Sequence, residues 1–234
     1  MPARTPVYLQ VAERLRTEIL AGRWEAGDTL PTERELSVSL GASRASIREA
    51  LRALEAQGLI VGGHASSRTV VGPGLSGALR EAVGNLLRLQ RIPLEDLIEF
   101  RRVIEGAAVH RAAALQDAEP LQDATTALAE MRQPDLDAET FHTLDLRFHT
   151  ALMRASGNEA LCLVFLSVRD AIARYLLERM AEHPDFSAGV QPLIREHAEI
   201  LAAIQVHDGA LAEARVHSHI AGFYEHFAGP APDR

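Results

Sequence analysis

The chain has 234 residues, a formal net charge of −8 and 47% hydrophobic residues, so it is long enough for two domains and apolar enough to bury a core. No run of about 18 apolar residues occurs and the N-terminus lacks the apolar stretch of a secretory signal, which argues against a membrane protein or a secreted one. Cys162 is the only cysteine, which excludes an internal disulfide and a thiolate metal cluster; together these features predict a cytoplasmic protein.

Charge is distributed unevenly along the chain. Residues 1–72 contain nine arginines and eight acidic residues, whereas the remainder contains fifteen arginines and twenty-four acidic residues. The N-terminal part is therefore compatible with nucleic acid although the whole chain is acidic. A Gly/Pro-rich stretch separates the two parts. We predict an N-terminal domain over 1–72, a linker over 73–76 and a C-terminal domain over 77–228.

Helical signals open the N-terminal domain. Apolar residues over 9–20 recur at helical spacing, and Gly22 ends this first predicted helix. Thr32 and, three residues later, Glu35 form a capping-box pattern that predicts the start of a second helix. That helix is expected to end at Gly41 after about two turns.

A third helix and two strands complete the predicted domain. Ser43 is a suitable cap for the third helix, and Gly58 ends it. The segments 59–61 and 69–71 are rich in β-branched residues and predict two short strands, joined by a loop around His64. Three helices followed by a two-stranded wing indicate a winged helix-turn-helix.

Strand signals disappear after the linker, and long amphipathic stretches follow, with Pro or Gly at or near their junctions. Short loops between such helices predict an antiparallel all-α bundle of about seven helices, so the fold class is mainly α. The predicted helices lie at roughly 77–91, 94–116, 119–132, 137–156, 158–182, 188–206 and 208–227.

The second and third helices have the layout of a helix-turn-helix, in which the N-terminal end of the second element enters the major groove. Arg44 and Arg48 lie four residues apart on one helix face, with Ser46 beside them. Guanidinium groups pair bidentately with guanine or bind phosphates, and hydroxyls suit either. Arg34 on the preceding helix and His64 at the wing tip complete the predicted DNA contacts. The alternative interpretation is that these arginines only solvate an exposed helix face.

This domain resembles the GntR family of bacterial regulators. The resemblance implies that Arg34, Arg44 and Arg48 contact DNA, and that Ser46 occupies a position which usually carries a small polar residue. The wing departs from the family pattern, because this chain has Ser-Arg-Thr-Val-Val over 67–71 where the family usually has Gly, Thr, an apolar residue and Val. The matching segments are 20–23, 27–36, 43–51 and 54–60.

Histidines in the C-terminal domain form a second pattern. Asp145 and His149 lie at i and i+4, so both side chains leave one helix face, although such a pair is more often a salt-bridged or solvated face than a metal site. His197 lies on the next-but-one predicted helix, and the last helix carries His217 and His219, between which spacing does not choose. Three neutral imidazoles and one carboxylate are a ligand set for zinc, nickel or a similar divalent ion.

Residues from about 94 to 227 resemble the all-helical effector domain of the FadR-like branch of GntR regulators, the FCD domain. The resemblance implies a metal site made of Asp145, His149, His197 and His219. It also implies that Arg101 faces the carboxylate of a small effector. The alternative role for Arg101 is a salt bridge to a residue such as Glu105. Zinc is the expected metal, with nickel or manganese as alternatives. His110, His142, His183, His207, His217 and His226 are interpreted as ordinary histidines.

The predicted function is that of a homodimeric transcriptional regulator, a repressor by expectation and not an enzyme. Two recognition helices would bind an inverted-repeat operator in double-stranded DNA, and a small organic acid at the metal would change the affinity for that operator. Two alternatives use the same Asp/His cluster. One is a metal-dependent hydrolase, and the other is a protein whose metal is structural only.

Overall fold

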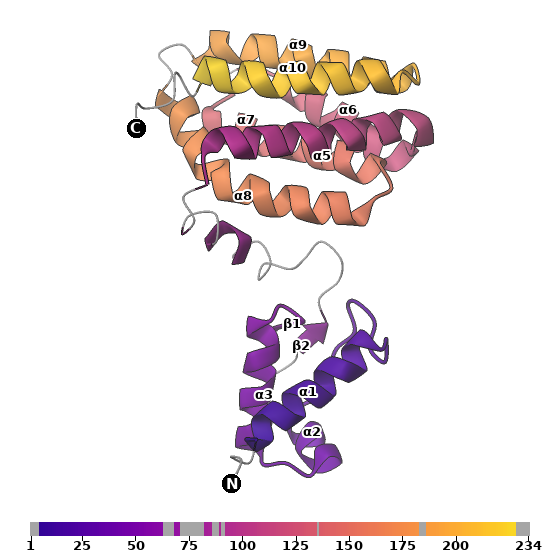
Figure 1. The fold of residues 1–234 in the computed structure, drawn as a ribbon, viewed down its shortest axis with the longest axis vertical. Helices are drawn as coiled ribbons and strands as arrows, with labels where there is room; N and C mark the ends of the chain where they lie inside the picture. The colour runs from indigo at the N-terminus through magenta and orange to yellow at the C-terminus, as the bar shows by residue number, and fades with distance from the viewer. Residues whose placement is uncertain are drawn as a thin grey trace. The chain divides into compact units, whose positions relative to one another are not determined.

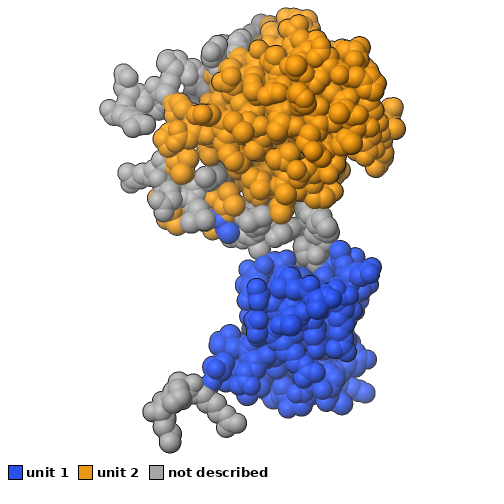
Figure 2. All heavy atoms as spheres, turned by 45° about the vertical axis from the view of Figure 1, so that its right-hand side comes forward, with its two compact units in different colours: residues 1–82 blue, residues 83–234 orange. Residues whose placement is uncertain are grey.

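A computed structural model describes the positions of most of the chain, which divides into two compact units, residues 1–82 and 83–234 (Figure 2). The predicted linker at 73–76, with the domain boundary beside it, lies outside the described residues, as does His64. The fold is mainly α, as predicted from the sequence. The described residues are 5–62, 68–70, 82–85, 89, 92–134, 136–182 and 186–227.

The first unit consists of helices and one antiparallel strand pair, in which Ile60 lies opposite Val70. Apolar residues at helical spacing on α1 and α3 meet in its core, including Leu15, Ile47 and Leu51, each at most 1% exposed. The arrangement is the expected winged helix-turn-helix. Its elements are α1 (Val7–Leu20), α2 (Glu33–Leu40), α3 (Arg44–Ala56), β1 (Ile60–Gly62) and β2 (Arg68–Val70) (Figure 1).

Local hydrogen bonds determine where α2 and α3 begin. The Thr32 hydroxyl accepts from the Glu35 amide at 3.3 Å, and the Glu35 carboxylate accepts from the Thr32 amide at 2.8 Å, so the predicted capping box is confirmed. Gly41 ends α2 in the left-handed region at φ 63°. The Ser43 hydroxyl accepts from the Ser46 amide at 3.1 Å, which starts α3 one residue later.

The second unit is an all-helical bundle in which α5 packs against α7 and α10, α7 packs against α6 and α8, and α9 packs against α10. Most of the predicted helix over 77–91 lies outside the described residues. Within that range, the described residues 82–85 are helical. The other six helices lie close to their predicted ranges. They are α5 (Leu94–Leu115), α6 (Ala118–Met131), α7 (Ala138–Ala155), α8 (Glu159–Glu182), α9 (Phe186–Gln205) and α10 (Gly209–Phe227) (Figure 1).

Polar side chains are buried inside this bundle. Burying a charge is unfavourable unless the charge is paired or bound to a metal, so such a group indicates a candidate functional site. Among the described residues of the bundle, the buried polar ones are Arg101, Glu105, Asp145, His149, Ser156, Ser167, Arg169, His197 and His219. Within the described part of the chain, no helix is both long and apolar enough to cross a membrane.

Candidate DNA-reading edge and candidate metal centre

Exposed arginines lie at the N-terminal ends of α2 and α3. Arg34 lies in the first turn of α2, Arg44 is the first residue of α3, and both are exposed. Neither has an ion pair with a described residue. Ser46 is half-buried, and its hydroxyl lies 3.0 Å from that of Ser43. The cations at this edge are therefore accessible to a partner, while the hydroxyl of Ser46 contacts the Ser43 hydroxyl that caps α3.

Arg48 is also exposed, but it has a protein partner. Its Nε lies 3.3 and 3.2 Å from the two carboxylate oxygens of Glu33, and its Nη2 donates to Glu33 Oε2 at 3.0 Å. These hydrogen bonds hold the pKa of Glu33 below its ordinary value. The contact between Glu33 and Arg48 was not predicted from the sequence, because no spacing rule connects a residue of α2 to one of α3.

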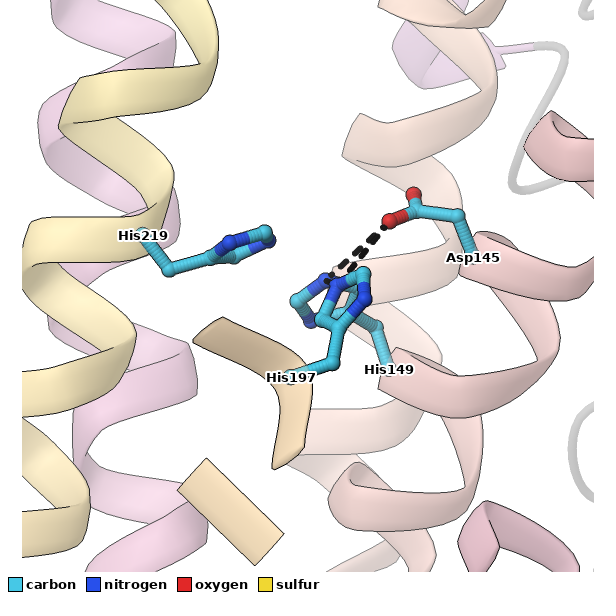
Figure 3. A group of neighbouring side chains, drawn as sticks. All are labelled: Asp145, His149, His197 and His219. Atoms are coloured by element: carbon cyan, nitrogen blue, oxygen red, sulfur yellow. Dashed lines mark hydrogen bonds and ion pairs between the residues drawn. The ribbon is translucent and has the colours of Figure 1, made fainter. Parts of the chain in front are cut away.

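The predicted metal ligands come together in the second unit. Asp145 and His149 lie on α7, His197 on α9 and His219 on α10, and their side chains converge (Figure 3). One ligand atom from each lies within 4.8 Å of the others, and all four residues are buried. Of the two alternatives on α10, the structure brings His219 into the cluster, whereas Nε2 of His217 lies 2.9 Å from the carbonyl oxygen of Arg102.

The separations between these ligand atoms fit a shared divalent ion. Nε2 of His197 lies 3.3 Å from Nε2 of His149 and 3.2 Å from Oδ1 of Asp145, and His149 Nε2 lies 3.6 Å from the same oxygen. Two atoms that are each about 2.0–2.1 Å from a tetrahedral zinc ion are roughly 3.4 Å apart. Oδ1 of Asp145 is also buried with no aligned hydrogen-bond donor among the described residues, a need that a cation satisfies.

Carboxylates lie behind two of the imidazole rings, as a hydrogen-bond partner of His219 and as an ion-pair contact of His149 that lacks hydrogen-bond alignment. Nδ1 of His149 lies 2.7 Å from Oε2 of Glu105, and Nδ1 of His219 lies 2.9 Å from Oε2 of Glu196. In metal sites, the second ring nitrogen of a histidine ligand commonly has a carboxylate partner, which fixes the tautomer and leaves Nε2 for the ion. The cluster has this arrangement at two of its three histidines.

Burial and neighbouring charges keep most of the cluster in its ligating form. Burial lowers the pKa of His197 to about 3 and also lowers that of His219, so both rings are neutral. Burial alone would raise the pKa of Asp145, but the Arg169 guanidinium and the neighbouring histidines hold it well below its ordinary value. The pKa of His149 rises, because the carboxylates of Glu105 and Asp145 outweigh the effect of burial. Neutral imidazole and ionised carboxylate are the forms that bind metal.

Arg101, predicted to face an effector, lies inside the bundle. Its Nε donates to Glu105 Oε1 at 2.8 Å, and its Nη1 donates to the Tyr224 hydroxyl at 3.1 Å. The salt bridge considered as an alternative is thus present. Arg101 also borders a cavity of about 10 Å³, which is the space of about one water molecule. The cavity lining comprises Arg101, Asp145, His149, Arg169, His219, Ile220 and Phe223.

Arg169 on α8 is a charged member of this site that the sequence analysis missed. It is 2% exposed, its Nη2 contacts Oδ2 of Asp145, and its Nε has no hydrogen-bond partner among the described residues. An arginine within an amphipathic stretch is typically interpreted as a solvent-exposed residue. Arg169 reaches the cavity because α8 packs against α7, α5 and α10, which no local pattern predicts.

Comparisons with known proteins match both units. The profile described as "Bacterial regulatory proteins, gntR family" matches residues 7–70, and the FCD domain profile matches 96–222. The HTH-type transcriptional regulator LutR of Bacillus subtilis is 29% identical, over 89% of this chain and 95% of its own length. The HTH-type transcriptional repressor NanR of Cronobacter sakazakii is 28% identical, over 93% of this chain and 84% of its own. The solved structure of a Streptococcus agalactiae GntR shares the fold, with a TM-score of 0.65 at 22% identity over 93% of this chain and 99% of that one.

Proposed function

Because this chain belongs to the GntR family of transcriptional regulators and carries an FCD effector-binding domain, we propose how its two units act. The protein is a repressor whose affinity for its operator is controlled by a small carboxylate effector. The effector binds beside a divalent metal ion inside the helical bundle. The buried cluster of four ligating side chains next to two buried arginines is the observation that carries this proposal.

DNA binding takes place at the exposed edge of the first unit. A homodimer presents two copies of α3 to successive major grooves, so its operator is an inverted repeat. Arg34, Arg44 and Arg48 supply the cations, and Ser46 supplies a hydroxyl, which lies 3.0 Å from the capping hydroxyl of Ser43. The exposure of all three guanidinium groups at the N-terminal ends of α2 and α3 supports this assignment. His64 completes the set as a wing contact.

Asp145, His149, His197 and His219 hold the metal, which we propose to be zinc, with nickel or manganese as alternatives. When bound, the ion supplies a Lewis-acidic centre that attracts a carboxylate oxygen. The protein contributes imidazole rings that have the carboxylates of Glu105 and Glu196 behind them. The separations of 3.2–3.6 Å between the ligand atoms of Asp145, His149 and His197 support this assignment.

The charges around the cavity favour an anionic effector. Arg101 and Arg169 balance Glu105 and Asp145, so a divalent ion leaves the buried site with surplus positive charge. A carboxylate removes that surplus while it accepts hydrogen bonds from Arg101 or Arg169. Since the cavity has the space of about one water, an organic acid enters only if the helices around it repack. This requirement couples effector binding to a second conformation, through which operator affinity changes.

Metal content and operator affinity together test the proposal. The purified full-length chain is expected to retain about one divalent ion per subunit by elemental mass spectrometry, and His197→Ala to lose most of it. His110→Ala is the matched control, because His110 is half exposed and paired with Glu213 away from the cluster.

A panel of mono- and dicarboxylates is then tested for its effect on binding of the protein to an operator selected from random DNA. We expect at least one acid to weaken operator binding about fivefold or more.

The small size of the cavity favours one alternative, a metal that only stabilises the bundle. Under this alternative, chelation lowers the melting temperature, but no acid raises it above that of the metal-loaded protein. Operator affinity is then also insensitive to every acid in the panel. That pair of results would replace effector control with a structural role for the ion, and would leave DNA binding by α3 unaffected.

A further inference from the structure

The contact between Glu33 and Arg48 uses one particular edge of the guanidinium group. Glu33 accepts from Nε and from Nη2 of Arg48, which is a side-on pairing. A guanidinium has five N–H donors in a rigid plane, so this pairing leaves the two N–H groups of Nη1 and one of Nη2. One N–H of Nη1 and the remaining N–H of Nη2 form the end-on edge, which is able to pair bidentately with O6 and N7 of guanine. Glu33 therefore binds Arg48 without occupying its base-reading edge.

Glu33 is itself held in place from a second direction. Its side chain is 17% exposed, and Nη1 of Arg68 lies 3.6 Å from its Oε1. Arg68 begins β2, is 14% exposed, and donates from Nε to Glu55 on α3 at 2.8 Å. Glu33 also lies in the first turn of α2, where a negative charge is favoured by the helix dipole. The carboxylate is thus anchored by the wing strand and by α2, while the Arg48 side chain remains 52% exposed.

We propose that Glu33, anchored by Arg68, is a positioning residue for base recognition, which aims the end-on edge of Arg48 at a guanine in the operator. The inference rests on the proposed function, in which α3 lies in the major groove. An arginine whose orientation is set in advance loses less side-chain freedom on binding, and it favours a bidentate base contact over a loose phosphate contact. A carboxylate at the DNA edge also weakens sequence-independent attraction to phosphates, so both effects increase discrimination.

A competing role for Glu33 makes the opposite prediction. If its carboxylate only competed with DNA for Arg48, removing its charge would strengthen binding to every sequence. If it orients Arg48, removing its charge relaxes the preference for one base pair, while binding to unrelated DNA stays the same or becomes stronger. A purely structural role would change melting temperature without a change in base preference. Base preference is therefore the measurement that separates these roles.

The experiment uses the full-length chain and double-stranded DNA selected by the wild-type protein from a random library. Affinities are measured for the selected site, for each single substitution of its G·C pairs, and for unrelated DNA, with Glu33→Gln, Arg48→Ala and Arg68→Gln. Glu13→Gln is the control, since it removes an exposed carboxylate that pairs only with Arg16 on α1 among the described residues. Thermal melting checks that each variant folds.

We expect Glu33→Gln to lose about tenfold of the preference at one G·C pair in each half-site, the same pair whose preference Arg48→Ala abolishes. Arg68→Gln should lose part of it, and Glu13→Gln should keep it. A double variant that combines Glu33→Gln with Arg48→Ala should lose no more preference than Arg48→Ala alone, because the effect of Glu33 passes through Arg48. A folded Glu33→Gln variant with the wild-type preference would overturn the inference, as would equal strengthening of binding to all sequences. A wild-type chain that selects no sequence would instead overturn the proposed function, and this inference with it.

Discussion

Arginine has opposite environments at the two candidate sites of this protein. Arg34 and Arg44 of the first unit are exposed to solvent at the ends of α2 and α3. Arg101 and Arg169 of the second unit are 3% and 2% exposed, and each contacts a buried carboxylate. A surface guanidinium stays hydrated until a partner arrives, so it contributes to binding and little to folding. A buried guanidinium has lost its water already, so the fold depends on its internal partner.

The largest effect on stability is expected when a buried ion pair is broken. Glu105→Gln removes the negative charge beside Arg101, and the free energy of unfolding of the second unit should fall by about 3–5 kcal/mol because an uncompensated charge remains buried. Urea denaturation of the full-length chain, followed by circular dichroism, measures this loss. The loss should persist in chelator, since Arg101 pairs with Glu105 directly. A loss below about 1 kcal/mol would show that Arg101 does not depend on this pair.

Loss of an exposed arginine should change DNA affinity rather than stability. Arg44→Ala removes a cation with no ion pair to a described residue, so stability should stay within about 0.5 kcal/mol of wild type. Affinity for the selected operator should fall by about 1–3 kcal/mol, because a base or phosphate contact is lost. Fluorescence anisotropy measures the affinity and thermal melting the stability. Unchanged operator affinity would remove Arg44 from the DNA-binding surface.

A smaller effect is expected where the first unit depends on helix capping rather than on buried charge. Thr32→Ala removes the hydroxyl that accepts from the Glu35 amide at the start of α2. The free energy of unfolding of the first unit should fall by about 1 kcal/mol, as for other N-cap substitutions. Thr32→Ser is the matched control and should retain most of the stability. Equal stability of the Ala and Ser variants would contradict the capping account.

The smallest effect is expected for a surface pair within the second unit. Glu199 and Arg215 lie 3.0 Å apart, but both side chains are about half exposed, at 50% and 49%. Glu199→Gln should lower the free energy of unfolding by less than about 1 kcal/mol, and added salt should reduce the difference further. Measured beside Glu105→Gln, it tests whether burial, rather than the number of ion pairs, sets the contribution of a carboxylate to stability.

Short-range features were predictable from the sequence. The capping box of Thr32 and Glu35, the cap at Ser43 and the end of α2 at Gly41 all involve groups within a few residues of one another. Helical spacing also placed Asp145 and His149 on one face of α7. These features depend on backbone geometry that repeats every 3.6 residues, so spacing alone identifies them. The more distant candidate ligands, His197 and His219, came from resemblance to a family, not from spacing.

Only the tertiary structure decided which distant charged groups meet. Arg48 and Glu33 are 15 residues apart, and Asp145 and Arg169 are 24 residues apart, on different helices in each case. Likewise, His219 rather than a neighbour two residues away joins the cluster because of the way α10 packs against α9. Crossing angles and rotations of packed helices depend on the whole set of buried side chains. No local pattern carries that information, so burial and pairing of these groups appear only in the folded chain.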